Sequence, residues 1–546
     1  MPGRRAALTR LGALAGVLLA LAAPGALAQA PAAASWLDEA GRPRPAAREA
    51  LRWLTEAEQH GLRPADYAAE RLARRLQQSE AQALPPETAA ELDAALTRHV
   101  LDFLHELRHG RVDAATRLKA RYDSATQPAP DLATALREAL ARGQPVDALR
   151  AALPPWPQYA ELQRALVRYR ELGEHAAWRQ PLPALPGGKL QPGQRWAGLP
   201  QLAARLQALG DLAGAPAGEA YGAELQQAVR DFQQRHALAA DGVLGKATLE
   251  ALAVPPARRA EQIALAMERL RLTPLPAAPR FVTVNVPEFV LRAHRHDAGA
   301  LHTDLRMRVI VGKALDTRTP LFDEDMRWIE FSPYWNIPPS IARSETLPKL
   351  RANPGYLASQ GMEFVGPGGT STAVTPENLA AVQAGSLRIR QRPGPRNALG
   401  DIKFMLPNNQ NIYLHHTPST GLFSRARRDF SHGCVRIEEP VALAQWVLHD
   451  QPEWTETRIR QSMGLPRPVI ARLLEPVPVL LTYQTAVADG GTLRFVPDLY
   501  GQDAALAEAL RQARGPRATS PSALRAAFVT PPRARPAGAT ETIAAQ

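Results

Sequence analysis

Apolar residues recur at helical spacing through the first third of the chain. In the segment 89–109, Leu92, Leu96 and Val100 fall on one face of a helix, as the i, i+4 repeat requires. Similar amphipathic segments follow one another from about residue 35 onward, separated by Gly and Pro that end each helix. The pattern predicts a helical scaffold domain over residues 36–180.

A second helical unit comes after a Pro-rich linker at residues 180–193. Two apolar stripes at helical spacing mark its first helices: Leu202, Leu206, Leu209, Leu225, Val229 and Phe232. Gly242 and Gly245 then provide turns before a short last helix. The spacing predicts a three-helix module over residues 195–255, joined to the next domain by a connecting helix at residues 258–271.

The period of the pattern changes after Pro279. Residues 281–286 alternate as a half-buried strand does, and further segments have strand character: Phe289–Arg292, Met307–Gly312 and Asn411–His415. Residues 338–396 are rich in Gly, Pro, Asn and Ser and form too long a stretch for a plain loop, so we expect an inserted lid. The pattern predicts a mainly-β domain over residues 280–485, with a helix at residues 440–449.

The first residues of the chain have the pattern of an export signal. Three arginines lie within the first ten residues, an apolar run covers Leu11–Ala23, and an A-x-A site ends at Ala28. These are the parts of a secretory signal peptide, so we predict a signal peptide over residues 1–28 and a periplasmic mature protein. An uncleaved anchor is the alternative, although the apolar run is shorter than the ~20 residues of a membrane span.

The overall composition is that of an ordinary globular protein, with 45% hydrophobic residues and a formal net charge of +12. A basic balance favours anionic partners such as a cell-wall polymer. No arginine stripe with interleaved aromatics occurs, so nucleic acid is not an expected partner. No segment of the mature chain has the apolar length of a transmembrane span. Residues 516–546, rich in Pro, Ala, Arg and Thr, predict a disordered tail.

Cys434 is the chain's one cysteine and its strongest candidate for chemistry. An exported protein with one cysteine cannot form an internal disulfide, so the thiol is better explained as a nucleophile than as a structural link. A thiol attacks as thiolate and needs a base within reach. His415, 19 residues upstream, is our candidate base and His432 the rival. A buried free cysteine acting as a small hydrophobe is the structural alternative.

The residues around the thiol supply the other groups that acyl transfer needs. Gly433 lets the backbone turn sharply and expose consecutive N–H groups, which can hold a developing oxyanion. Arg436 can clamp a substrate carboxylate. A zinc site built from Cys434 and its neighbouring histidines is a rival, but His415 and His416 are adjacent on a predicted strand and point to opposite faces. We therefore expect no metal.

Together these residues resemble the catalytic motif of the L,D-transpeptidase family, a histidine, an intervening loop and then S-H-G-C-V-R, here Ser431–Arg436. Tyr334–Pro339 resembles a second signature of its large, lid-bearing members, as do Gly61–Tyr67 and Leu107–Val112 in the scaffold. Residues 195–255, with a D-G-x-x-G-x-x-T ending, resemble a peptidoglycan-binding repeat. The resemblance implies a multidomain α+β fold, with a helical N-terminal scaffold, a three-helix peptidoglycan-binding-like module and a mainly-β L,D-transpeptidase catalytic domain with an inserted lid.

The resemblance also implies a role for each catalytic position. Cys434 would be the nucleophile, and His415 the general base and later the acid. His432, Gly433 and Cys434 would line the oxyanion hole through backbone N–H groups. The residue after the base, here His416, would orient it through its backbone carbonyl.

On the substrate side, Arg436 would contact the peptide stem, Trp335 would shape the donor site, and Ser431 would lie beside them. The implied reaction is acyl transfer on peptidoglycan stem peptides without a cofactor. The thiol attacks the carbonyl of the third residue of a tetrapeptide stem, D-alanine leaves, and an amine of a second stem resolves the thioester to a 3→3 cross-link. A carbapenem is expected to acylate the same thiol.

Other outcomes remain open at the level of sequence. Water in place of the amine gives an L,D-carboxypeptidase, and a lipoprotein lysine gives lipoprotein attachment. A catalytically inactive scaffold that binds the wall, with glycan contact through residues 195–255, is the non-enzymatic alternative. A papain-like peptidase fits less well, because its cysteine precedes its histidine in the chain.

Overall fold

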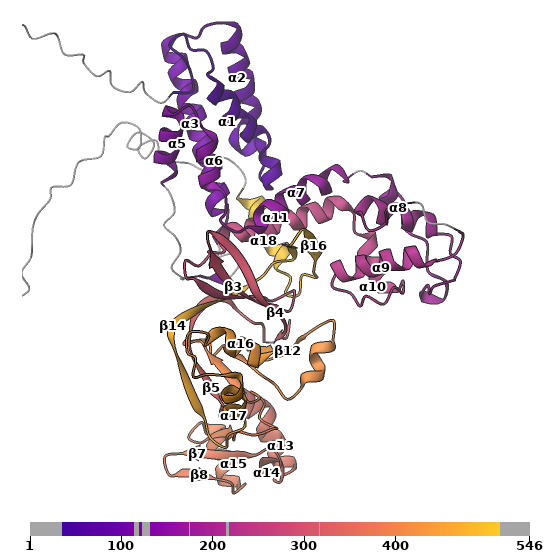
Figure 1. Cartoon of the computed structure of the whole chain (residues 1–546), viewed down its shortest axis with the longest axis vertical. Coiled ribbons are helices and arrows are strands. Elements are labelled where there is room, and N and C mark those ends of the chain that lie inside the picture. The colour runs from indigo at the N-terminus through magenta and orange to yellow at the C-terminus, as the bar shows by residue number, and fades with distance from the viewer. Residues whose placement is uncertain are drawn as a thin grey trace, which may run out of the picture.

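The computed structural model describes residues 35–113, 120–122, 131–173, 175–214, 218–315 and 317–513. The predicted signal peptide and C-terminal tail lie outside the described residues. The described chain is elongated, with the N-terminal helices at one end, a small lobe at the other and the main sheet between them (Figure 1). A three-helix module projects to one side of this axis.

The N-terminal region is helical, as predicted. Its helices are α1 (Pro45–Thr55), α2 (Ala69–Ala81), α3 (Pro86–His109), α5 (Leu132–Ala141), α6 (Val146–Ala152) and α7 (Gln158–Glu171), with short turns η1 (Ala57–His60) and η2 (Pro64–Tyr67). The predicted apolar face of α3 is buried, with Leu92, Leu96 and Val100 inaccessible to solvent. A proline in the first turn starts both α1 and α3, where its missing N–H costs no hydrogen bond.

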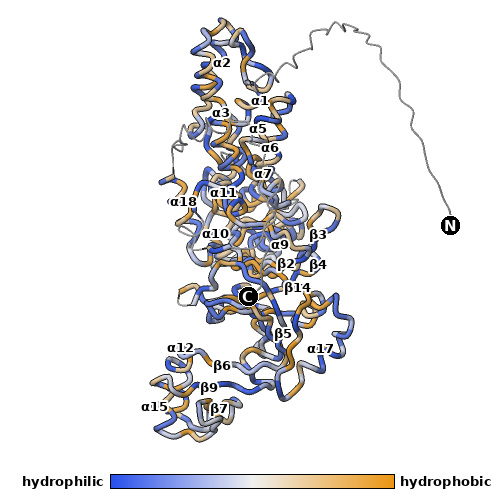
Figure 2. Tube along the Cα trace, turned by 90° about the vertical axis from the view of Figure 1, so that its left-hand side faces the viewer, coloured by the Kyte–Doolittle hydropathy of each residue, from blue (hydrophilic) through white to orange (hydrophobic). Residues whose placement is uncertain are grey.

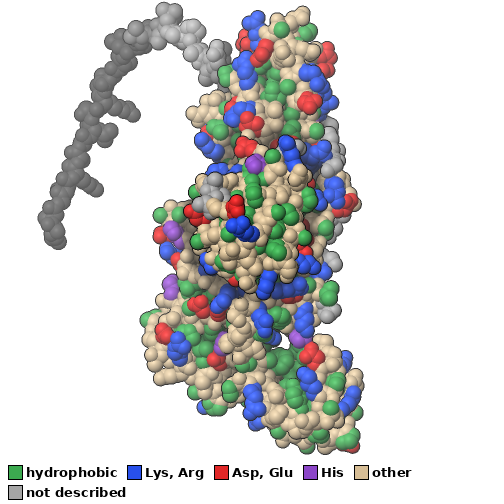
Figure 3. All heavy atoms as spheres, turned by 90° about the vertical axis from the view of Figure 1, so that its right-hand side faces the viewer, with side chains coloured by type: hydrophobic (Ala, Val, Ile, Leu, Met, Phe, Trp, Pro, Cys, Tyr) green, Lys and Arg blue, Asp and Glu red, His purple; other side chains and the backbone are tan. Residues whose placement is uncertain are grey.

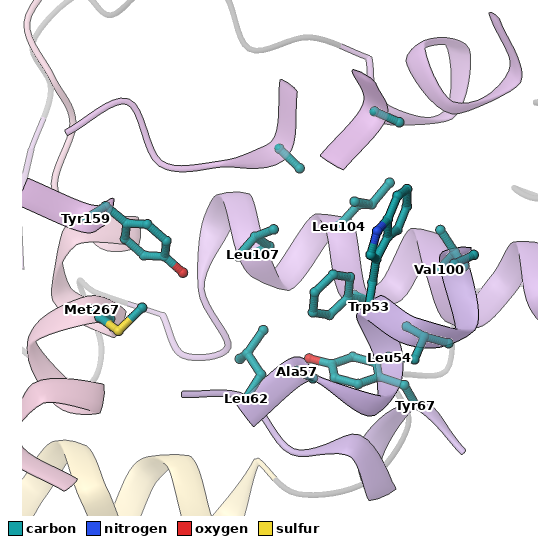
Figure 4. Close-up of a cluster of buried hydrophobic side chains, with 14 of the residues drawn as sticks. Trp53, Leu54, Ala57, Leu62, Tyr67, Val100, Leu104, Leu107, Tyr159 and Met267 are labelled. Carbon is teal, nitrogen blue, oxygen red and sulfur yellow. The ribbon is translucent and has the colours of Figure 1, made fainter. Parts of the chain in front are cut away.

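The scaffold core continues into the rest of the molecule. Trp53, Leu54, Tyr67 and Leu104 converge from α1, η2 and α3, and Met267 approaches from a helix far along the chain (Figure 4). The same buried cluster extends to aromatic and aliphatic side chains of the main sheet region: Phe281, Leu480, Ala486 and Phe495. Scaffold and sheet therefore share one apolar core.

The connecting helix α11 (Pro256–Leu272) lies inside this junction, and the charged residues of its last turns, Glu268, Arg269 and Arg271, are buried. Arg271 donates to Glu268 at 2.8 Å and to the Tyr159 hydroxyl at 2.7 Å. Glu268 also accepts from the backbone N–H of Arg111 at 2.5 Å. Buried charges are stable only when paired and hydrogen-bonded, so this network fixes how the scaffold sits on α11.

The three-helix module comprises α8 (Leu199–Leu209), α9 (Ala223–Arg235) and α10 (Lys246–Ala253) around its own core. Buried Gln233 on α9 holds the last turn, because its amide bonds Asp241, Val243, Thr248 and the Gly242 N–H. Buried Arg205 on α8 donates to carbonyls of the linker, which contains η3 (Ala176–Trp178) and η4 (Pro186–Gly188).

The region that follows α11 is built on one large sheet. Its strands are β2 (Arg280–Asn285), β3 (Val290–Asp297), β4 (Ala300–Gly312), β5 (Leu321–Phe331), β10 (Ile402–Met405), β11 (Leu414–His415), β13 (Val435–Ile437) and β14 (Val469–Thr482). They pair in the order β5-β10-β11-β13-β4-β3-β2-β14, and β14 pairs back with β5, so the sheet closes on itself. Two short strands add to its edges, β1 (Ala120–Arg121) and β12 (Asp429–Ser431).

Helices and a hairpin cover the sheet. They are α16 (Pro440–Val447), α17 (Glu456–Met463), α18 (Gln502–Gln512) and the hairpin of β15 (Ala486–Asp489) and β16 (Thr492–Phe495), with a short turn η6 (Thr420–Ser424) before β12. Strand β2 is buried along almost its whole length, which differs from the half-buried strand expected. Its Phe281 belongs to the scaffold core and its Val282 to the sheet core, because both faces of the sheet are covered here.

A buried histidine on β3 gives a stability prediction. His294 bonds the hydroxyls of Thr283 at 2.9 Å and Thr303 at 3.2 Å. Burial, assisted by the charge of Arg292, lowers its pKa from 6.5 to about 4. Between these two pH values the unfolded chain binds a proton at His294 that the folded chain does not. The contribution of His294 to the free energy of unfolding is therefore fully present above pH 6.5 and is lost as the pH falls toward 4.

Within that window the free energy of unfolding of the wild type should rise by about 1.4 kcal/mol per pH unit because of His294. We expect His294→Gln to lack this rise. Urea unfolding of both proteins at pH values across the window measures it. Equal slopes in the two proteins would contradict the prediction.

The insertion forms a separate lobe with its own core. Its strands β6 (Trp335–Asn336), β9 (Arg388–Gln391), β7 (Met362–Gly366) and β8 (Gly369–Ser371) form a small sheet in that order. Its helices are α12 (Pro339–Ile341), the π-helical turn η5 (Ala342–Thr346), α13 (Leu347–Ala352), α14 (Tyr356–Ser359) and α15 (Pro376–Ala384). Its first strand therefore begins at Trp335, three residues before the predicted lid.

Apolar and polar residues alternate along the elements (Figure 2). Figure 3 shows basic, acidic and hydrophobic side chains interspersed over one face. Within the described ranges, no helix combines the length and hydropathy that a membrane crossing requires.

Candidate active site

A cleft of about 760 Å³ lies between the main sheet and the lid. Six of the eight residues singled out in the sequence line it: Cys434, His415, His432, Arg436, Trp335 and Ser431. Gly433 and His416 lie outside the lining, and each contacts residues that do line it. The cleft is thus the place where a substrate can meet the thiol.

The strand register places the thiol and the imidazole on one face of the sheet. Strand β11 runs parallel to β13, with His415 opposite Arg436, and the N–H of Val435 bonds the carbonyl of Tyr413 at 3.2 Å. Side chains two residues apart on a strand share a face. Cys434 and Arg436 therefore project from the same face as Tyr413 and His415, and the rings of Tyr413 and His415 are 5.7 Å apart.

The loop before Cys434 is fixed by side-chain hydrogen bonds. Ser431 donates to the Cys434 carbonyl at 2.6 Å and accepts from the Gly433 N–H at 3.2 Å. Thr317 and Thr319 donate to the carbonyls of Ser431 and Gly433. Gly433 has φ +115°, which a residue with a side chain rarely adopts. The sequence therefore has glycine where the chain makes the turn immediately before Cys434.

These bonds decide which N–H groups are available in the cleft. The Gly433 N–H is engaged by Ser431, whereas the structure gives the Cys434 N–H no hydrogen-bond partner among the residues described. The Cys434 N–H is thus the better placed of the two to meet an oxyanion.

His415 is held as a neutral base. Its Nδ1 donates to the backbone carbonyl of His416 at 2.5 Å. A carbonyl can only accept, so Nδ1 carries the proton and Nε2 keeps a lone pair. Burial is the main cause that lowers the pKa of His415 to about 3. The charges of Arg436 and Lys403 act in the same direction, and the carbonyls of His416 and Leu399 act against it.

The side chain of His416 anchors this carbonyl. Its Nδ1 bonds the Asp401 carboxylate at 2.7 Å, and its N–H donates to the Ile402 carbonyl at 3.0 Å. Gly400, with φ +66°, lies so close that a Cβ there would be 2.8 Å from the His416 backbone. His416 therefore points away from the cleft, while its backbone orients His415.

The thiol of Cys434 is half-buried and protonated in the free protein. Its Sγ donates to the carbonyl of Asn411 at 3.4 Å, which Asn411 presents by adopting φ +57°. Burial raises the pKa of the thiol, and hydrogen bonds from Tyr413 together with the charges of Lys403 and Arg436 oppose that rise. Burial thus favours a neutral imidazole and a neutral thiol in the cleft.

Sequence reasoning missed Lys403 and Tyr413. Lys403 lies opposite His415 on β10, lines the cleft and places its ammonium 4.0 Å from the centre of the Tyr413 ring. Burial lowers the pKa of the Lys403 ammonium, and the charges of Glu330 and Cys434 oppose that shift. Burial also raises the pKa of Tyr413, so its hydroxyl remains a donor. Only the strand register, which no motif spacing encodes, brings these two residues to the thiol.

Lys403→Met is expected to raise the pKa of the Cys434 thiol, because it removes a cation that stabilises the thiolate. The rate of thiol alkylation by a small neutral reagent, followed against pH, measures this pKa. Lys349→Met is the matched control, since Lys349 is exposed on α13 and does not line the cleft. An unshifted alkylation profile in Lys403→Met would contradict the assignment.

Arg436 is a cation that lines the cleft. No ion pair to it is found among the residues described, and its buried Nε has no hydrogen-bond partner. Arg388 of the lid also lines the cleft and is exposed. Together with Lys403, these two side chains make the cleft suited to an anionic ligand.

Trp335 and His432 lie on opposite walls of the cleft. Trp335 pairs with Gln391 in the lid sheet and packs against the lid core, at the point where the lid joins the main sheet. His432 reaches across to Glu345 of η5, with 2.6 Å between its Nε2 and the carboxylate. Within the part of the chain that is described, no group of three or more His, Cys, Asp or Glu is arranged to hold a metal ion.

Three segments of the chain match known protein families. Residues 279–469 match the YkuD family, described as "L,D-transpeptidase catalytic domain". Residues 29–166 match a "Scaffold domain", and residues 197–252 a "Putative peptidoglycan binding domain". A curated protein of Haemophilus influenzae named "Putative L,D-transpeptidase" is 34% identical over 242 residues, which are 44% of this chain and 48% of that protein. The match spans about half the length of that relative.

Two solved structures align with the chain at low similarity. An L,D-transpeptidase of Xylanimonas cellulosilytica is 19% identical, covering 56% of this chain and 100% of that one, with a TM-score of 0.16. A fused Zn-dependent amidase/peptidase/peptidoglycan-binding protein of Clostridium acetobutylicum is 11% identical, covering 54% and 98%, also with a TM-score of 0.16. Scores this low carry no argument.

The family matches confirm the multidomain fold expected from the sequence, with a helical region, a helical module and a mainly-β catalytic domain. Residues 279–469 of this chain are thus similar to the catalytic domain of the L,D-transpeptidase family.

Proposed function

We propose that this protein forms 3→3 cross-links in peptidoglycan through a thioester on Cys434, releasing D-alanine from tetrapeptide donor stems. One observation carries the proposal: a thiol, a neutral imidazole and an arginine project from one face of the sheet into one cleft. These are the groups that acyl transfer from a carboxylate-bearing peptide needs.

Acylation begins when the substrate carbonyl enters the cleft. His415 Nε2 takes the proton of the Cys434 thiol as the sulfur attacks the carbonyl carbon between the third and fourth stem residues. The N–H of Cys434 and the hydroxyl of Tyr413 are the donors for the oxyanion that forms. The imidazolium then gives its proton to the amine of D-alanine, which leaves, and the thioester remains.

Substrate recognition follows from the charges in the cleft. Arg436 binds a carboxylate of the donor stem, and Arg388 and Lys403 extend the cationic surface around it. Trp335 and Ser431 complete the donor side. Arg436 lowers the pKa of the thiol as well, so it assists attack and binds substrate from the same position.

We place the mature protein in the periplasm, where its substrate lies. The predicted signal peptide and the family of the catalytic domain support this location. The module at residues 197–252 is the candidate contact for glycan strands, on the strength of its family match. It lies beside α11 and away from the lid, so it would act on the wall polymer and not on the reacting bond.

A defined tetrapeptide muropeptide tests the proposal. Purified protein is incubated with it, and the products are followed by mass spectrometry. We expect free D-alanine and a dimer whose mass equals that of two tetrapeptides minus one molecule of alanine. Tripeptide without dimer would mean an L,D-carboxypeptidase, and binding without D-alanine release would support the inactive scaffold and contradict the proposal.

A further inference from the structure

The cleft holds one carboxylate among its described lining residues, and it is on the lid. Glu345 lies on η5 and faces His432, two residues before the nucleophile, while the cations of the cleft lie on the sheet or on β9. A carboxylate is unfavourable beside the carboxylates of a donor stem. Its presence in a cationic cleft therefore calls for a second, positively charged ligand.

The pair that Glu345 makes is weak enough to admit such a ligand. Its side chain is 42% exposed and that of His432 is 35% exposed, so solvent screens their attraction. The carboxylate can only accept, so His432 Nε2 is the donor in their bond and Nδ1 keeps a lone pair. A carboxylate and a proton acceptor thus stand together next to Cys434.

The ligand must also be one that the thioester can use. A primary ammonium binds a carboxylate through charge-assisted hydrogen bonds and becomes nucleophilic once it has lost a proton. Water carries no charge, so a carboxylate such as Glu345 would not favour it in the same way. Glu345 lines the same cleft as Arg388 and Arg436, so the cleft offers a carboxylate for an amine as well as cations for the donor carboxylate.

We propose that Glu345 binds the ammonium of the acceptor and that His432 receives its proton, so that the lid favours amines over water in the second half of the reaction. This inference rests on the proposed function, because it assigns the acceptor of the same acyl-enzyme. Glu345 and His432 form the acceptor site, while Arg436, Lys403 and Arg388 bind the donor stem beside Cys434.

The step balances in protons and electrons. The ammonium loses one proton through His432 to solvent, and the neutral amine attacks the thioester carbonyl carbon. The C–N bond forms, the C–S bond breaks, and its electron pair returns to the sulfur. The second amine proton passes through His415 to that sulfur, so the protein returns to neutral thiol and neutral imidazole.

The test is the partition of the acyl-enzyme between amine and water. Wild-type protein and Glu345→Gln are given the tetrapeptide donor with increasing concentrations of a diamino-acid stem peptide, and dimer and tripeptide products are counted against released D-alanine. We expect the ratio of dimer to tripeptide to fall about tenfold in Glu345→Gln, since an amide keeps the size but not the charge. Glu377→Gln, on the exposed surface of α15 in the same lobe, is the control and keeps the wild-type ratio.

A second acceptor distinguishes charge from shape. Hydroxylamine is largely uncharged at neutral pH. With hydroxylamine as the acceptor, the acyl-enzyme should partition between amine and water in the same ratio in wild type and in Glu345→Gln. An unchanged ratio with the ammonium acceptor, or an equal loss with both acceptors, would overturn the inference. Failure of wild-type protein to release D-alanine would instead count against the proposed function.

Binding can be measured without turnover. In the Cys434→Ala background, calorimetry with the acceptor stem alone is expected to show a severalfold weaker affinity when Glu345→Gln is added. Equal affinities would overturn the assignment whatever the activity of the protein.

Discussion

Replacing Cys434 with alanine is expected to abolish release of D-alanine from the tetrapeptide donor, by at least about 10⁴-fold in turnover. The reason is that the chain contains no other thiol, so no side chain can form the thioester in its place. Release of D-alanine and formation of dimer, measured together, test both halves of the reaction. Turnover that survives in Cys434→Ala would contradict the role of this residue.

The same variant should remain folded. Cys434 is half-buried and packs at the margin of the sheet core, and its loop is fixed by Ser431, Thr317 and Thr319 instead of by the sulfur. Thermal unfolding of Cys434→Ala close to that of the wild type is the control. A variant that unfolds early would leave Cys434→Ser, which retains a donor toward Asn411, as the second test of the nucleophile.

The second large effect is expected at His415, where substitution by glutamine should slow acylation by about 10²–10⁴-fold, the range of a lost general base. The glutamine amide can still donate to the His416 carbonyl, so the variant removes the base while retaining the local bond. Single-turnover acylation by the donor peptide, detected as protein mass, measures the step directly. Substitution of the exposed His449 by glutamine is the control, and a His415→Gln protein that acylates at the wild-type rate would contradict the assignment.

The pH profile gives an independent check on this base. The pKa of His415 is about 3 because the ring is buried beside Arg436, so the imidazole stays neutral from mildly acidic to alkaline pH. The rate of acylation should therefore show no inflection from this residue near 6.5, the ordinary pKa of histidine. The resting site is a thiol beside a neutral imidazole, and not a preformed thiolate–imidazolium pair.

Local patterns predicted those parts of the fold whose environment is simple. The helix ending at Gly110 and the helix starting at Pro440 occur as α3 and α16, because amphipathic spacing and end residues act within a few positions. Strand β2 was expected to be half-buried, but Thr283 and Asn285 are buried as well. The pattern of one strand does not reveal that a separate domain covers its other face.

The site was predictable to the extent that its residues are close in sequence. The motif from Ser431 to Arg436 identified one wall of the cleft, and the spacing to His415 pointed to the neighbouring strand. Lys403 and Glu345 reach the same cleft from other segments, one through the register of β10 with β11 and the other through the lid. Their chemistry depends on tertiary contacts, which no spacing in the sequence specifies.

The proposed mechanism requires that Cys434 carry the donor peptide as a thioester. Rapid acid quenching of the reaction, followed by intact mass and peptide mapping, detects this intermediate, with a carbapenem as a slower acylating probe of the same group. We predict a mass increase equal to the donor stem without its D-alanine, located on the peptide that contains Cys434 and missing in Cys434→Ala. Release of D-alanine with no adduct at Cys434, or with the adduct on another residue, would contradict the mechanism.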